Sequence, residues 1–152
     1  MRRLSGVLLA GAMLMLPAFS QNAGVQAQAP QKLTMEGDLA LWSVAIRPDK
    51  TADFEKIMGK IKEALSKSEA AEAKQQLAGW KVMKMSKPMP DGNIIYTHVI
   101  TPVAGADYNI LQVLYATFKD PAEQKELYDM YRGAFAANLG ISSGTVAADL
   151  SK

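Results

Sequence analysis

The sequence predicts a single α+β domain that follows a removable N-terminal leader. Segments in which apolar and polar residues alternate, as in strands, are interleaved with segments whose apolar residues recur at helical spacing. Proline and glycine clusters separate these segments. About 125 residues remain after the leader, and a chain of this length buries enough surface for one hydrophobic core.

The first 27 residues have the plan of a signal peptide. Arg2-Arg3 precedes an apolar run that ends before Pro17, and Val25-Gln26-Ala27 provides small residues for cleavage after Ala27. The alternative is a retained membrane anchor, but the apolar run is shorter than the roughly 20 residues that a spanning helix needs. We therefore expect an exported protein, periplasmic or secreted, with no membrane association after cleavage.

The remaining chain divides into residues 28–38, expected to be a flexible mature N-terminus, and a single domain at 39–152. Cleavage removes two of the 17 basic residues and leaves 15, which equals the number of acidic residues. No basic excess remains to favour nucleic acid. The chain has no cysteine, which excludes disulfides and a lipoprotein anchor.

The first half of the domain predicts a strand and a long helix. Residues 39–46 alternate and stop before Pro48, as a strand would. Thr51 can cap a helix whose apolar side chains fall on one face: Phe54, Ile57, Met58, Ile61, Ala64 and Leu65. Gly59 lies opposite this face, and nothing in the sequence explains it.

The second half predicts a short helix, a hairpin, two helices and an uncertain last strand. The short helix ends at Gly79 as a C-cap glycine, and residues 80–87 and 93–101 alternate as an antiparallel hairpin. Asp107 and Asp120 can cap the next two helices, and the second should end near Asn138. Residues 145–150 could form the final strand, which the sequence leaves open.

This order, β-α-β-β-α-β, is that of ferredoxin-like domains, in which helices cover one face of an antiparallel sheet. Large apolar residues occur on both faces of the predicted strands, so the second face also needs cover. With the segments Gly79-Trp80-Lys81-Val82 and 91–96, the chain resembles exported bacterial proteins of the dimeric α+β barrel superfamily. The resemblance implies a homodimer packed sheet to sheet around a cavity. Some members are cofactor-independent monooxygenases or haem-degrading enzymes, and fold alone is a weak guide to function.

Four residues are candidates for lining a ligand pocket: Trp42, Trp80, Tyr96 and His98. His98 is the only histidine, so a site with several histidines is excluded. It shares a strand face with Tyr96, where it could shuttle a proton or serve as an axial ligand. The alternative is an ordinary hydrogen-bonded strand residue.

Three further patterns have simpler explanations. The segment 140–144 matches G-x-S-x-G, but a nucleophile elbow needs a strand before the serine and a helix after it, so we interpret the segment as a loop. Met83 and Met85 could bind Cu(I), although methionines on a strand more often pack an interface. The tyrosines of the last helices could rim a pocket or point into water: Tyr108, Tyr115, Tyr128 and Tyr131.

These observations favour an exported homodimeric domain that binds a small apolar or aromatic ligand or acts as an interaction module. The alternative is a cofactor-independent monooxygenase or haem-handling enzyme of the dimeric α+β barrel type. We expect no cofactor and no metal site, and the sequence leaves open whether the protein is an enzyme.

Overall fold

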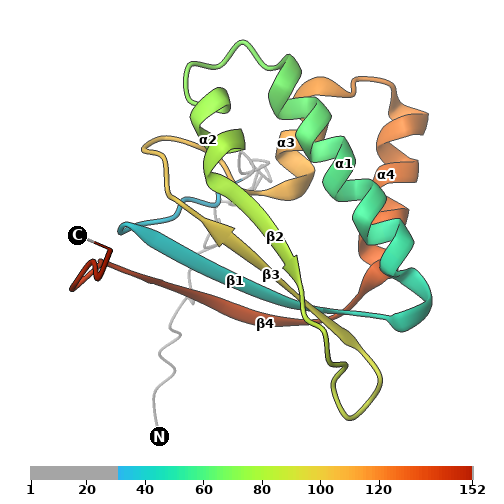
Figure 1. The fold of residues 1–152 in the computed structure, drawn as a ribbon. Helices are drawn as coiled ribbons and strands as arrows, with labels where there is room; N and C mark the ends of the chain where they lie inside the picture. Colours follow the sequence, from blue (N-terminus) through green and yellow to red (C-terminus); the bar gives the residue numbers. More distant parts are fainter. Residues whose placement is uncertain (1–30, 152) are drawn as a thin grey trace, which may run out of the picture.

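A computed structural model describes residues 31–151, so the expected signal peptide lies outside the described residues. These described residues form a four-stranded antiparallel sheet in the order β2-β3-β1-β4, with four α-helices (Figure 1). This α+β architecture and strand order are compatible with the ferredoxin-like plan. β1 is a central strand, paired with β3 on one side and with β4 on the other.

β1 (Leu39–Ile46) has the bounds that its alternation predicts. Ala40, Trp42, Val44 and Ile46 are buried against the helices, whereas Leu39 and Leu41 face the other way and are exposed. A short 3₁₀ turn (Pro48–Lys50) leads into α1 (Thr51–Lys67). Thr51 is the first residue of α1 and not its cap, because the N-cap position falls on Lys50.

α1 buries the apolar face that its spacing predicts, apart from the half-buried Met58. α2 (Ala73–Gly79) then connects α1 to the hairpin of β2 (Trp80–Lys84) and β3 (Ile94–Ile100). Gly79 does not adopt the left-handed conformation expected of a C-cap glycine. Glycine instead lets the end of α2 lie close to the backbone of Thr101, because a Cβ atom at position 79 would lie 3.0 Å from the carbonyl oxygen of Thr101.

α3 (Ile110–Thr117) is capped by Asn109 and not by Asp107, since the Asn109 side chain accepts from the Gln112 amide. Asp107 Oδ1 instead accepts the amides of Asn109 and Leu33 at 2.9 Å each. α4 (Pro121–Ala134) begins as predicted, with Asp120 Oδ1 accepting the Glu123 amide at 2.9 Å.

The last strand is the main correction to the sequence prediction. α4 ends at Ala134, and β4 (Phe135–Gly144) follows at once, ahead of the expected segment at 145–150. Residues 135–139 look helical in isolation, but the free edge of β1 offers backbone partners that a solvated helix end does not. Tertiary pairing thus overrides local preference here.

The geometry of β4 accounts for Gly140, the first glycine of the G-x-S-x-G match. The register of β4 shifts between Ser43 and Val44, where Gly140 and Asn138 are the partners and Leu139 is left unpaired. Gly140 has a φ of 105°, which suits glycine in such a bulge. The segment 140–144 is therefore a strand and not a loop, and no helix follows it up to residue 151.

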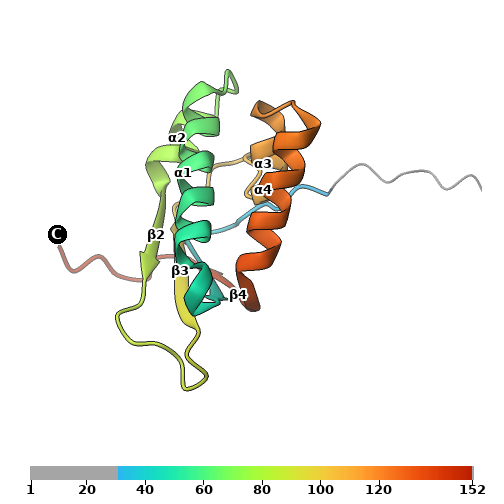
Figure 2. The same cartoon turned by 90° about the vertical axis from the view of Figure 1, so that its right-hand side faces the viewer.

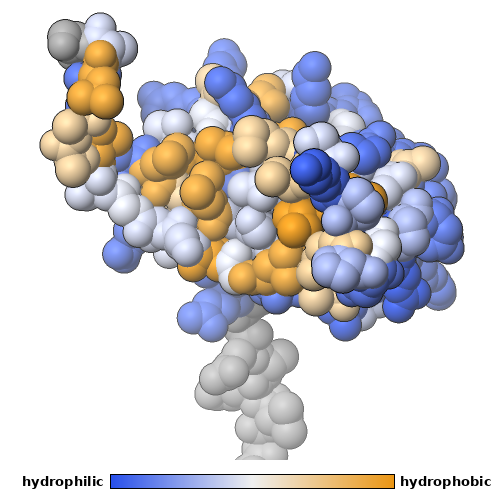
Figure 3. Space-filling model, turned by 60° about the horizontal axis from the view of Figure 1, so that its bottom comes forward, coloured by the Kyte–Doolittle hydropathy of each residue, from blue (hydrophilic) through white to orange (hydrophobic). Residues whose placement is uncertain are grey.

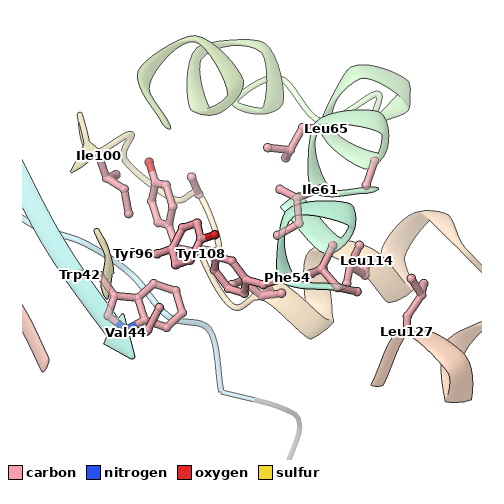
Figure 4. Close-up of a cluster of buried hydrophobic side chains, with 14 of the residues drawn as sticks. Trp42, Val44, Phe54, Ile61, Leu65, Tyr96, Ile100, Tyr108, Leu114 and Leu127 are labelled. Carbon is pink, nitrogen blue, oxygen red and sulfur yellow. The ribbon is translucent and has the colours of Figure 1, made fainter. Parts of the chain in front are cut away.

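The helices form one layer over one face of the sheet, and α1 contacts each of the other three (Figure 2). Aromatic and aliphatic side chains from β1, β3 and α1 meet between the two layers (Figure 4). Residues 31–38 make defined contacts with the domain: Tyr108 donates its amide to the Leu33 carbonyl at 2.8 Å, and Met35 is buried.

Candidate functional site

His98 lies at the centre of the helix-covered face, because the strand register aligns it with Trp42 of β1 and Val82 of β2. Its ring stacks on that of Trp42, with centroids 4.7 Å apart and planes 21° from parallel. The ring of Phe54 on α1 lies nearly perpendicular to that of His98, with the two ring centroids 6.1 Å apart. His98 is fully buried as a result.

The hydrogen bonds of His98 define its chemical state. Trp80 Nε1 donates to His98 Nδ1 at 3.0 Å, which places the proton of a neutral ring on Nε2. Among residues 31–151, Nε2 has no hydrogen-bond partner. Burial lowers the pKa of His98 to about 4. The ring is therefore uncharged at neutral pH and separated from bulk water.

Tyr96 belongs to a separate polar cluster at the edge of the same layer. Its hydroxyl donates to Glu55 Oε1 at 2.6 Å, and Lys84 Nζ donates to the same oxygen at 2.9 Å. Both hydrogen bonds hold the pKa of Glu55 below its usual value. Burial and the Glu55 carboxylate raise the pKa of Tyr96, so this cluster links α1 to β2 and β3 rather than presenting a reactive phenolate.

The four predicted pocket residues are thus neighbours, and two of them line different spaces. Trp42 lines a groove of about 470 Å³, and Trp80 lines a different cavity of about 60 Å³. Neither Tyr96 nor His98 lines either one. The side chains fill the region around His98 themselves.

A groove beside Trp42 adjoins this cluster. It runs along the start of β4 at the end of α4, and six of its lining residues carry rings or polar groups: Trp42, Arg47, Tyr131, Arg132, Phe135 and Asn138. Asn138 Oδ1 accepts from Trp42 Nε1 at 3.1 Å and from the Gly140 amide at 3.1 Å. The bulge of β4 therefore fixes this wall of the groove.

Sequence reasoning identified Trp42 but missed the two arginines. A signal was available: after Arg3 the chain contains only Arg47 and Arg132, whereas its other basic residues are lysines. The two arginines are 85 positions apart in the sequence. The turn after β1 and the last turn of α4 bring both of them to one groove. Only the fold reveals this pairing.

The face of the sheet away from the helices, here called the open face, has no cover within residues 31–151. Exposed side chains on it include Leu39, Leu41, Met83 and Met85, and Ile95 and Val99 are half-buried. Figure 3 shows apolar side chains gathered on this side of the molecule. The two central polar groups satisfy each other, because Ser43 Oγ and Thr97 Oγ1 lie 2.9 Å apart.

Residues 31–151 contain no helix that is long and apolar enough to span a membrane. The same residues contain no group of three or more histidine, aspartate or glutamate side chains placed to hold a metal ion. No protein-family model, no curated protein and no solved structure matches the chain.

Proposed function

We propose that the protein is an exported small-ligand-binding module that acts as a homodimer, with two copies packed open face to open face. The apolar open face is the observation that carries this proposal. Monomeric proteins rarely leave a contiguous apolar surface of more than a few hundred Å² in water. Four strands about 4.8 Å apart and five to ten residues long present roughly that area as a flat surface.

A second copy is the occupant that suits this face best. Sheets pack face to face about 10 Å apart when their side chains are apolar and of moderate size, as Leu41, Met83 and Val99 are. The Ser43–Thr97 hydrogen bond leaves no polar side chain at the centre that needs a partner of another kind. Lys81, on the outer strand β2, can keep its charge at the rim in water.

The proposal is for binding and not for acid–base catalysis, and the state of His98 supports this choice. A general base must reach its substrate and change protonation near the working pH. His98 is 0% exposed, its Nδ1 accepts from Trp80, and burial lowers its pKa to about 4. The aromatic cluster therefore serves as a rigid support for the adjoining groove.

The test places a charge on the open face and compares it with a matched charge elsewhere. Leu41 and Ile141 are both 41% exposed on neighbouring strands, but Leu41 lies on the open face, whereas Ile141 pairs with Trp42 and lies on the other face. We expect native mass spectrometry and sedimentation to show dimers for the chain from Gln28 and for Ile141→Glu, and monomers for Leu41→Glu. A monomeric parent protein, or a dimeric Leu41→Glu, would overturn the proposal.

A further inference from the structure

We infer that the groove beside Trp42 binds a small aromatic carboxylate, with the ring on the aromatic side chains and the carboxylate at Arg47 and Arg132. This inference rests on the proposed ligand-binding function and names the class of ligand. Three features of the groove support it: its unpaired positive charge, its aromatic surface and its supply of hydrogen-bond donors.

The charge of the groove has no counterpart among the described residues. Neither Arg47 nor Arg132 forms a salt bridge within residues 31–151, where every salt bridge uses a lysine. No aspartate or glutamate lines the groove. A guanidinium group offers a planar pair of donors that matches a carboxylate in a way that an ammonium group does not. The two arginines thus leave a site for an anion.

The aromatic surface comes from α4 and the sheet. Tyr131 and Phe135 pack edge to face with centroids 4.6 Å apart, and Trp42, whose ring stacks on His98, also lines the groove. Burial raises the pKa of Tyr131, so its hydroxyl stays neutral and adds no negative charge near the arginines. Rings in this arrangement favour a flat apolar group over an inorganic ion.

The side chains around the groove offer more hydrogen-bond donors than free acceptors. Asn138 Oδ1 already accepts two hydrogen bonds, which leaves the Asn138 Nδ2 amide as a donor without a partner among residues 31–151. The groove volume of about 470 Å³ lies within the range usual for small-ligand sites. A ligand that presents acceptors at one end and an aromatic ring at the other matches this arrangement.

The experiment measures binding of 2-naphthoate by calorimetry and Trp fluorescence. Two comparison compounds test the rings and the charge separately. 2-Naphthamide has the rings without the charge, and inorganic phosphate is an anion without the rings. We expect 2-naphthoate to bind about tenfold more tightly than either. Equal binding of 2-naphthoate and 2-naphthamide, or tighter binding of phosphate, would overturn the assignment.

Substitutions then locate the site. Arg47→Gln and Arg132→Gln should each weaken 2-naphthoate binding about tenfold and leave 2-naphthamide unchanged. Lys74→Gln removes the same charge from α2, away from the groove, and should change binding by less than about twofold. Unchanged binding in both arginine variants would place the ligand elsewhere. Measuring the oligomeric state and 2-naphthoate binding of the parent protein together separates the two proposals, because a monomeric parent that binds 2-naphthoate contradicts only the dimer, whereas a dimeric parent that fails to bind contradicts only the ligand.

Discussion

His98 is a polar residue in an aromatic environment, and its environment decides its charge. Three rings and a single hydrogen bond surround it, from Trp42, Phe54 and Trp80. A neutral imidazole can accept the Trp80 N–H and stack on Trp42, whereas an imidazolium would lose the acceptor and gain an unsolvated charge. The fold therefore selects the neutral ring.

We expect His98 to make the protein less stable as the pH falls from about 6.5 to about 4. Burial lowers the pKa of His98 from 6.5 to about 4, so in this window the unfolded chain binds a proton that the folded chain excludes. Stability is then full above pH 6.5 and falls by up to about 3 kcal/mol as the pH approaches 4.

Urea unfolding of the parent protein and of His98→Phe over this pH range measures the effect. The variant loses the acceptor of Trp80 at every pH, so the difference between the two free energies of unfolding should contain a constant part and a part that changes by about 3 kcal/mol. A difference that stays constant with pH would show that His98 titrates equally in both states.

At the scale of the element, α1 was predictable because local and tertiary preferences agree. Its apolar residues fall on one face, and that face is the one the sheet buries. The end of α4 was not predictable because these preferences conflict: residues 135–139 suit a helix, but β1 needs a second neighbour. The N-terminal ends of α1 and α3 differ from prediction by one and two residues: Asn109 caps α3 in place of Asp107, whereas the N-cap position of α1 falls on Lys50, whose side chain makes no capping hydrogen bond.

Gly59 interrupts α1 on its exposed side, and the structure shows no reason for it. A Cβ atom built there meets nothing within 4 Å, and the backbone is helical. We expect Gly59→Ala to stabilise the protein by about 1 kcal/mol, which chemical denaturation would measure.

Gly79→Ala is the matched control, because it makes the same change at the end of α2. Its Cβ would lie 3.0 Å from the Thr101 carbonyl oxygen and 3.1 Å from Thr101 Cβ, so this variant should be less stable than the parent. If Gly59→Ala also destabilised the protein, the exposed face of α1 would have to be covered by something else.

At the scale of the whole molecule, alternation along the strands predicted that both faces of the sheet are apolar, but not what each face contacts. The four candidate pocket residues share one face, as their spacing implies, and the helices cover that face. Spacing along a strand identifies the residues that lie together. It cannot specify whether a helix, a ligand or a second chain lies opposite them, because all three bury the same side chains.

Val146 extends the open face and provides a test of the dimer at its rim. It is 60% exposed and lines a shallow cavity with Leu39 and Leu41. We expect Val146→Ser to weaken dimerisation about fivefold, because roughly half of a valine side chain would lose its apolar contact.

Dilution followed by native mass spectrometry measures this change. Tyr128→Ser, on α4 and 42% exposed, removes apolar surface from the helix side and should leave the dimer unchanged. Equal weakening in the two variants would contradict an interface confined to the open face.

The placement of β1 between β3 and β4 has a consequence for how the chain folds. The first strand cannot complete its hydrogen bonds until the last strand is made, since Leu39 pairs with Gly144. Contacts so distant in sequence must overcome a large loss of chain entropy, which slows folding. A chain that stopped at Ala134 would have all four helices but no β4, and the indole N–H of Trp42 would lose its Asn138 partner. Folding of this domain is thus delayed until β4 has been synthesised, and chains that lack β4 remain targets for proteolysis.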